Sequence, residues 1–151
     1  GLRWLRIYEN ANLTRLPDSF GSLSALTYLQ IGGQQEQWAW LNTLPPSFGI
    51  LTALNTLYIQ QAKFTTWPES LSSSNLKSLV YLYIQRTSLT SIPSSINKIT
   101  SLTSLTFYQN SIGGTTPDVS TLTKLTYLCF NTNVVRALDP SICNLTALVQ
   151  L

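Results

Sequence analysis

The sequence contains no histidine, few charges and only two cysteines. Without histidine, the commonest general base and a frequent metal ligand are both missing. Two cysteines are too few for a disulfide framework or for a zinc site. No glycine-rich phosphate loop is present, because the paired glycines at 32–33 and 113–114 lack a third glycine and a following helix. We therefore expect neither an enzyme nor a protein that holds a metal or a cofactor.

Long hydrophobic runs and blocks of like charge are also missing. No apolar stretch approaches the ~18 residues that cross a bilayer, so direct insertion into a membrane is not expected. Charged residues make up 10% of the chain, against about a quarter in an average domain. The nine basic and six acidic residues are scattered and give a net charge of +3, which argues against a nucleic-acid partner.

What the chain does contain is an internal repeat. The block at 79–101, LVYLYIQRTSLTSIPSSINKITS, is copied along the whole sequence. Each block opens with L-x-x-L-x-[IF], continues through a loop, and reaches [LIW]-P-x-x-[FIL] before the next block begins. Blocks start 23 to 28 residues apart, which predicts six full repeats and the start of a seventh in one domain at 1–151. They start at Leu2, Leu26, Leu54, Leu79, Leu102, Leu125 and Leu148.

The positions of the aromatic residues follow the alternation of a strand. Side chains of a strand point to opposite faces in turn, so the fourth and sixth positions of a block are predicted inside and the third, fifth and seventh outside. All seven tyrosines stand at outward positions and all five phenylalanines at inward ones. All seven prolines, which cannot donate to a sheet ladder, fall in the segment predicted on the other side. The sequence thus predicts one parallel sheet with tyrosines on its outer face.

With LPDSFGSLSAL, LPPSFGILTAL and IPSSINKITSL in one spacing, the whole chain resembles the leucine-rich-repeat family. The fifth block, NSIGGTTPDVSTL, is similar to the plant extracellular pattern N-x-L-x-G-x-I-P, with Thr116 in place of isoleucine. The resemblance implies an α/β solenoid, a right-handed horseshoe segment with a parallel concave β-sheet and an irregular or short-helical convex side. The family's ladder asparagine stands at Asn10, Asn110 and Asn133, whereas Gln34, Ala62 and Thr87 replace it in the middle blocks.

No capping pattern is visible at either end of the sequence. Terminal repeats of a solenoid need a polar cap, because their core is otherwise open to water. We expect these residues to be a segment of a longer chain or to stack on a neighbour, with an engineered fragment as the alternative. Self-association through uncapped ends is the corresponding hypothesis for a partner.

The outer face of the predicted sheet is the first candidate site. Tyrosine and tryptophan offer rigid contact area and are enriched at binding hot spots, and their rings also suit sugars. The alternative is that aromatic residues stand there for their strand propensity and pack on one another. Glutamine and arginine beside the rings are expected to supply hydrogen bonds. The predicted ligand-binding residues are Trp4, Tyr8, Tyr28, Gln30, Tyr58, Gln60, Tyr81, Tyr83, Gln85, Arg86, Tyr108 and Tyr127.

Two further features are candidate sites. Trp38 and Trp40 lie in a polar insert of the second block, where they either fold back onto the solenoid or anchor a partner. Trp67, which replaces the leucine before a proline, is instead predicted to be core. Asn12 and Asn144 each begin an N-x-[ST] glycosylation sequon in a segment predicted to face solvent.

The cysteines and the acidic residues have simpler interpretations. Cys129 and Cys143 are predicted on opposite sides of one coil, too far apart for a disulfide. We expect two unpaired thiols, or a bond to a partner outside these residues. Asp18, Glu69 and Asp118 each follow a repeat's proline, where their charge would stabilise the start of a helical turn.

Together these features predict a non-catalytic recognition module that binds a protein, peptide or glycan. An extracellular or cell-surface location is expected, with a cytoplasmic one as the alternative. A second hypothesis is a structural component of a cell-surface coat, matrix or filament. Low charge and abundant Ser, Thr and Gln would suit self-association of that kind.

Overall fold

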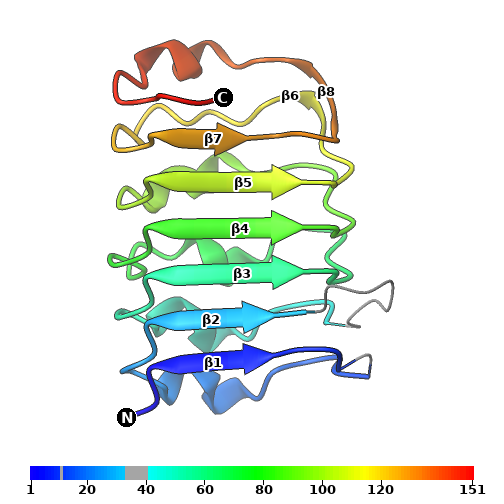
Figure 1. Cartoon of the computed structure of the whole chain (residues 1–151), viewed down its shortest axis with the longest axis vertical. Coiled ribbons are helices and arrows are strands. Elements are labelled where there is room, and N and C mark those ends of the chain that lie inside the picture. The colour runs from blue at the N-terminus through cyan, green and yellow to red at the C-terminus, as the bar shows by residue number, and fades with distance from the viewer. Residues whose placement is uncertain (11, 33–40) are drawn as a thin grey trace.

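The computed structural model describes residues 1–10, 12–32 and 41–151. These residues form a stack of coils, each of which places one strand in a sheet on the same side of the molecule (Figure 1). Most of the predicted insert, with Trp38 and Trp40, lies outside the described residues, as does Gln34. The main sheet contains β1 (Trp4–Ile7), β2 (Tyr28–Ile31), β3 (Thr56–Gln60), β4 (Tyr81–Gln85), β5 (Ser104–Tyr108) and β7 (Tyr127–Cys129), all parallel and in sequence order.

The register of the sheet places equivalent positions of neighbouring blocks side by side. Leu57 pairs with Leu82 at the fourth position, and Ile59 with Ile84 at the sixth. These inward side chains are buried, so the predicted division between inward and outward positions is confirmed. Tyr127 also forms an isolated parallel bridge with Gln150, the third position of the seventh block.

Phenylalanine rings run through the interior of the solenoid. Phe48 and Phe64 are fully buried. Phe107 is buried as well and stacks on the half-buried Phe130, with 5.7 Å between ring centroids. Trp67 is buried as predicted, and its Nε1 donates to the Ser72 Oγ at 2.8 Å. Each such ring contributes about 1.5–3 kcal/mol by leaving water, so the stacked core drives each coil onto the next.

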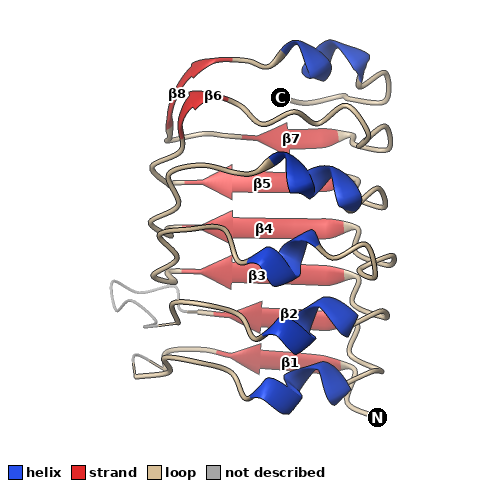
Figure 2. Ribbon diagram, turned by 180° about the vertical axis from the view of Figure 1, so that it is seen from behind, coloured by secondary structure: helices blue, strands red, loops and turns tan. Residues whose placement is uncertain are grey.

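Short 3-10 helices cover the side opposite the sheet (Figure 2). The chain enters each helix through an extended residue, which is a proline in four of the five described helices. None of the described helices is long and apolar enough to cross a membrane. The helices are η1 (Asp18–Ser22), η2 (Pro46–Ile50), η3 (Glu69–Ser72), η4 (Ser94–Lys98) and η5 (Pro140–Asn144).

The fifth repeat departs from this arrangement. Asp18 and Glu69 lie in the first turns of η1 and η3, as predicted, but no helix follows Asp118. Its carboxylate instead accepts a hydrogen bond from the backbone N–H of Ser120 at 2.8 Å, which lowers the pKa of Asp118. Here β6 (Gly113–Thr115) pairs with β8 (Val134–Ala137) in a small second parallel sheet, which the sequence analysis did not predict.

A residue with left-handed backbone ends each strand of the main sheet. Five of these are not glycine and have φ between 49° and 57°. In the second repeat Gly32, one position earlier in its block, has a φ of 115°, and a Cβ there would lie 1.8 Å from the carbonyl oxygen of Gln60. Only glycine fits there, because the neighbouring strand passes too close. We refer to the residues at the eighth position of their blocks as the bend residues: Glu9, Gln61, Arg86, Gln109 and Thr132.

The asparagine that follows the bend joins consecutive coils. The Asn110 Oδ1 accepts from the backbone N–H of Thr87 at 2.9 Å, and its Nδ2 donates to the carbonyl oxygen of Ile84 at 3.0 Å. Asn133 repeats the arrangement one coil later, with Ile112 N–H as donor at 3.1 Å. Thr87, which replaces this asparagine in its own block, is therefore satisfied by the asparagine of the next block.

Candidate binding face on the main sheet

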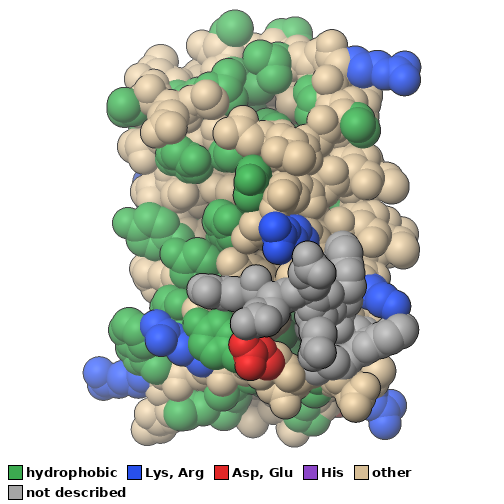
Figure 3. All heavy atoms as spheres, turned by 45° about the vertical axis from the view of Figure 1, so that its right-hand side comes forward, with side chains coloured by type: hydrophobic (Ala, Val, Ile, Leu, Met, Phe, Trp, Pro, Cys, Tyr) green, Lys and Arg blue, Asp and Glu red, His purple; other side chains and the backbone are tan. Residues whose placement is uncertain are grey.

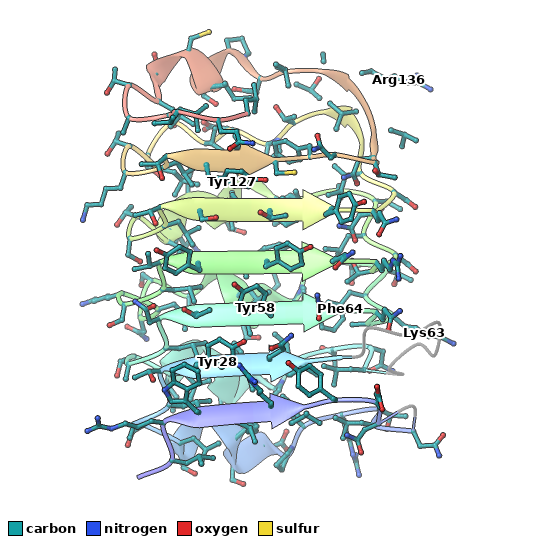
Figure 4. The ribbon with its side chains drawn as sticks, viewed as in Figure 1. Tyr28, Tyr58, Lys63, Phe64, Tyr127 and Arg136 are labelled. Carbon is teal, nitrogen blue, oxygen red and sulfur yellow. The ribbon has the colours of Figure 1, made fainter. Side chains whose placement is uncertain are left out.

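The seven tyrosines all lie on the solvent side of the main sheet or just beyond a strand end. None of them is buried, and Tyr8 and Tyr81 are exposed, whereas the phenylalanines are buried or half-buried within the core. The predicted opposition of phenol and benzyl rings is therefore confirmed. Figure 4 shows Tyr28, Tyr58 and Tyr127 in front of the strands that carry them.

Four of the aromatic rings contact one another across adjacent strands. Trp4 and Tyr28 are stacked in nearly parallel planes, with 4.7 Å between centroids and 14° between planes, whereas the following pairs are tilted. Tyr58 follows at 5.9 Å from Tyr28, and Tyr83 at 5.4 Å from Tyr58. The Arg6 guanidinium lies 5.3 Å from the Tyr28 ring centre, a cation–π contact. We call Trp4, Tyr28, Tyr58 and Tyr83 the aromatic row.

An open cavity of about 530 Å³ lies beside the row. Its walls are mostly apolar, and two of its aromatic side chains, Trp4 at 62% and Tyr81 at 47%, remain exposed. In Figure 3 the hydrophobic side chains gather on this side of the solenoid over its N-terminal strands, with basic side chains beside them. We call this cavity the hollow; it is lined by Trp4, Thr27, Tyr28, Asn55, Thr56, Tyr58 and Tyr81.

Glutamine side chains form a second row across the same strands. The Gln30 Nε2 donates to the Gln60 Oε1 at 3.2 Å, and the Gln60 Nε2 donates to the Gln85 Oε1 at 3.2 Å. The Gln85 Nε2 then donates to the Gln109 Oε1 at 3.0 Å. These four amides therefore form a continuous hydrogen-bonded chain, which we call the glutamine ladder.

Tyrosine hydroxyls complete the glutamine ladder. Tyr8 and Tyr28 both donate to the Gln30 Oε1, at 2.6 and 2.7 Å, and Tyr83 donates to the Gln85 Oε1 at 3.0 Å. Gln30 is only 8% exposed. Its amide oxygen therefore fixes the orientation of Tyr8 and Tyr28. The sequence had instead predicted that Gln30 would form hydrogen bonds with a ligand.

Tyr83 on β4 and Tyr127 and Cys129 on β7 share one face of the sheet, with β5 between them. Burial, reinforced by the charges of Tyr108 and Cys129, raises the pKa of the Tyr83 hydroxyl above its usual 10.0. A hydrogen bond with Cys129 raises the pKa of Tyr127. Cys129 stands at an outward position of β7 but is only 6% exposed, whereas Cys143 is exposed, and both thiols are free.

The remaining candidates are placed as follows. Arg86 is half-exposed at a bend, and its Nε donates to the Gln109 Oε1 at 2.8 Å. Asn12 and Asn144 are exposed, so both sequons are accessible. Arg6 and Gln109 were missed by the sequence analysis. Arg6 stands at the fifth position of its block, as Tyr58 does, so the pattern could have placed it on the outer face. Gln109 comes after the last outward position of its block, so the pattern did not indicate where it lies.

The fold defines a class, a repeat solenoid with one parallel sheet on one side and short helices on the other. Neither a family model nor a curated protein sequence matches the chain. Solved structures do match it. One is the leucine-rich-repeat ectodomain of the plant membrane receptor kinase GASSHO1/SCHENGEN3 from Arabidopsis thaliana, in complex with CASPARIAN STRIP INTEGRITY FACTOR 2. It is 26% identical, with a TM-score of 0.73, and the match covers 89% of this chain and 16% of that one.

Two further structures place the match in a wider group. The plant peptide hormone receptor RGFR1 in complex with RGF2 is 26% identical, with a TM-score of 0.73 over 91% of this chain and 22% of that one. The leucine-rich-repeat domain of the type III effector XCV3220 (XopL) is 24% identical, with a TM-score of 0.64 over 97% and 46%, and shows the fold alone. The chain spans less than a quarter of each receptor structure.

The chain is a leucine-rich-repeat protein. The solenoid implied by the sequence resemblance is confirmed, with its parallel sheet on one side and short helices on the other. This is the architecture of a protein-interaction module.

Proposed function

We propose that the chain is a non-catalytic recognition module that binds a protein or a peptide through the aromatic row and the hollow. The observation that carries the proposal is the hollow itself, an apolar depression walled by exposed Trp4 and Tyr81 on the open face of a rigid sheet. Exposed aromatic side chains of this kind are enriched among the residues that dominate binding energy. The two receptor structures named above, each in complex with its factor or hormone, support this choice of partner.

The geometry of the rings favours a peptide over a glycan. A sugar binds an aromatic residue by lying on the face of the ring. In the aromatic row the rings of Tyr28 and Tyr58 each lie between two neighbours, at centroid distances of 4.7 to 5.9 Å. Trp4 stacks on Tyr28, and Tyr58 has tilted rings on both sides, so neighbouring rings crowd the row and hinder a sugar from lying flat on it. The apolar hollow suits an apolar side chain of a polypeptide.

Stacking alone does not account for the face. The alternative, that the aromatic residues stand there only to stabilise the sheet, fits the ring contacts of Tyr28, Tyr58 and Tyr83. It leaves Tyr81 unexplained, because Tyr81 has no ring partner among the described residues and stands 47% exposed beside the hollow. An exposed, unpaired tyrosine at the wall of a cavity is the feature expected of a contact surface.

Panning of a random peptide library tests this function. The library is displayed as internal inserts and panned on the wild-type chain and on a variant with Tyr58→Ala, Tyr81→Ala and Tyr83→Ala. We expect peptides that are enriched on the wild type and lost on the variant. The control is Ile50→Ala, which removes an exposed apolar side chain from η2 on the opposite side. Circular dichroism checks that each variant keeps its fold.

Two outcomes contradict the proposal. Equal binding of the selected peptides to the wild type and to the triple variant would show that the aromatic row is not the binding site. If no peptide is enriched and the purified chain instead associates with itself as its concentration is raised in ultracentrifugation, the structural role in a coat, matrix or filament is favoured.

We also propose that the chain works outside the cell or at its surface. Exposure of Asn12 and Asn144 supports this, as does the resemblance to receptor ectodomains. Expression through a eukaryotic secretory pathway should give a product whose mass falls on treatment with an endoglycosidase. Asn12→Gln combined with Asn144→Gln should abolish that change in mass. A secreted wild type without glycans would contradict the assignment of the sequons.

A further inference from the structure

We propose that Arg86 and Gln109 form a carboxylate-binding site at the C-terminal end of the glutamine ladder. An acidic side chain of the bound peptide occupies this site while an apolar side chain of the same peptide fills the hollow. The inference rests on the proposed function and specifies the partner's chemistry. It follows from the direction of the ladder, the donors left at its end, the charges around it and the distance to the hollow.

Arg86 fixes the direction of the ladder. A guanidinium group has only donors, so the Gln109 atom that faces the Arg86 Nε at 2.8 Å must be the oxygen. The same oxygen accepts from Gln85 at 3.0 Å, so Gln85 turns its NH₂ toward Gln109 and its oxygen toward Gln60. Gln60 and Gln30 are oriented in the same way, so the Tyr8 and Tyr28 hydroxyls, which can either donate or accept, donate to the Gln30 oxygen.

The two ends of the ladder consequently differ. At the first end the Gln30 oxygen is saturated by two hydroxyls. At the other end the Gln109 oxygen is saturated by Gln85 and Arg86, so only the Gln109 NH₂ and the two terminal NH₂ groups of Arg86 remain. Neither set of N–H groups has a hydrogen-bond acceptor among the described residues. The amide dipoles point the same way and add to the charge of Arg86, because hydrogen bonds in a chain polarise one another.

A carboxylate is the group that matches these donors. Guanidinium N–H pairs fit two carboxylate oxygens, and charge-assisted hydrogen bonds of this kind are about twice as strong as neutral ones. The surroundings favour a negative ligand as well. Among the acidic residues that the structure describes, only Glu9 follows a strand of the main sheet; the others stand on the side of the helices. Arg6 adds a second positive charge to the face.

The distance to the hollow defines the spacing of the two side chains. Tyr81, at the hollow, and Arg86 lie at the beginning and just past the end of β4. Five steps along a strand span ~16 Å. A peptide lying extended over β4 covers this distance in about four or five residues. The predicted ligand therefore has an aromatic or aliphatic side chain and an Asp or Glu about four or five residues away.

The chain itself supplies the variants that test this site. Glu9 occupies the bend in the first repeat and Gln61 and Gln109 occupy it in the third and fifth, all with φ near 55°. Arg86→Glu and Arg86→Gln therefore place at this bend residues that fold there elsewhere in the same molecule. Arg136→Glu is the matched charge control, since Arg136 is exposed on β8 away from the sheet face (Figure 4).

The experiment uses peptides selected by panning on the wild type, made with amidated C-termini so that only side-chain carboxylates are present. We expect an acidic position in the selected sequences, and a change of that residue to its amide should weaken binding to the wild type about tenfold in a fluorescence titration. The same change should have little effect on Arg86→Gln. Panning on Arg86→Glu should select Lys or Arg at that position and keep the apolar one.

The outcomes separate this inference from the function on which it rests. Two results would overturn the carboxylate site but not the binding face. In the first, the selected peptides depend on Tyr58 and Tyr81 but have no acidic position. In the second, they have an acidic position that is still selected on Arg86→Glu. Equal effects of Arg86→Glu and Arg136→Glu would mean that only overall charge matters, which also overturns the site. If no peptide depends on the tyrosines, both proposals fall.

Discussion

Asn110 joins two coils through one side chain. Its amide contacts Thr87 and Ile84 of the preceding coil, and these groups are buried. Asn10 holds the same place in the first repeat, but there it is exposed, and among the described residues its side chain donates to the Tyr8 carbonyl oxygen alone. The two residues therefore separate the effect of the bridge from the effect of the residue type.

Replacing Asn110 by alanine should be much more harmful than replacing Asn10. A buried donor or acceptor left without a partner costs about 1–3 kcal/mol, so we expect Asn110→Ala to lower the free energy of unfolding by about 3 kcal/mol. Asn10→Ala should lower it by less than about 1 kcal/mol. Urea unfolding followed by circular dichroism measures both. Equal losses would show that Asn110 does not act as a bridge.

Tyr83 gives the sheet face a pH dependence at alkaline pH. Its pKa is raised above 10.0 in the folded chain, chiefly by burial, so the unfolded chain releases this proton first. The stability that Tyr83 contributes is fully present below pH 10.0 and is lost as the pH rises through the raised pKa. Tyr83→Phe should therefore make unfolding less sensitive to pH above 10. The difference in phenolate absorbance between parent and variant should titrate with a midpoint above 10.0, and a midpoint below it would contradict this prediction.

At the scale of a single element, Gly32 determines how closely β2 and β3 approach. A methyl group at Gly32 would meet the Gln60 carbonyl oxygen, whereas at Gly114, which also has positive φ, it would meet nothing within 4 Å. Gly114→Ala should thus cost only the backbone strain, about 1–2 kcal/mol. Gly32→Ala adds the steric clash and should lower the melting temperature markedly further. Thermal unfolding of both variants measures the difference, and similar melting temperatures would show that β3 moves aside easily.

The sequence predicted the strands of the main sheet because their pattern repeats. The fourth and sixth positions of L-x-x-L-x-[IF] place two strand side chains per coil in the core, and a shift by one residue would expose them to water. The same logic placed Tyr58 and Tyr81 outside and Phe107 inside. No such pattern marks β6 and β8, where Gly113 and Gly114 have no side chain, so the second sheet was missed.

The glutamine ladder was not predictable from the spacing of the repeats. Gln30 stands at the fifth position of its block, Gln60 and Gln85 at the seventh, and Gln109 at the eighth. The ladder therefore runs obliquely across the register, and it depends on the length of each side chain and on which neighbour its amide reaches. The alternation of the strand predicted that Gln30, Gln60 and Gln85 lie on the outer face, as they do. It did not predict that their amides bond to one another, and their hydrogen bonds were expected to go to a ligand.

At the scale of the whole molecule, each coil contacts only its neighbours. Stability in such a stack is a sum of repeats and of the interfaces between them. Leu82 in β4 is buried between two strands, whereas Leu5 in β1 is half-buried and has a strand on one side only. A destabilising substitution at Leu82 should therefore affect the strands on both of its sides, whereas one at Leu5 should affect the first coil and its one neighbour.

Hydrogen exchange detected by mass spectrometry tests this expectation. Leu82→Ala, which should cost about 2–5 kcal/mol, is expected to speed exchange in β3, β4 and β5 together. Leu5→Ala should speed exchange in β1 and leave β4 unchanged. If both variants raise exchange evenly along the chain, the solenoid opens as one unit and the description as coupled coils is wrong.

The aromatic row has a consequence for observing the molecule. Its four rings belong to four successive coils and lie 4.7 to 5.9 Å apart, close enough for their electronic transitions to couple. Because the coupling exists only while the coils are docked, the near-ultraviolet circular dichroism of the unlabelled protein reports their order. Trp4 is the one tryptophan of the row, so its contribution to this spectrum arises at the first coil. Three of these chromophores, Trp4, Tyr28 and Tyr58, also line the hollow, so the same spectrum should change when a ligand binds there.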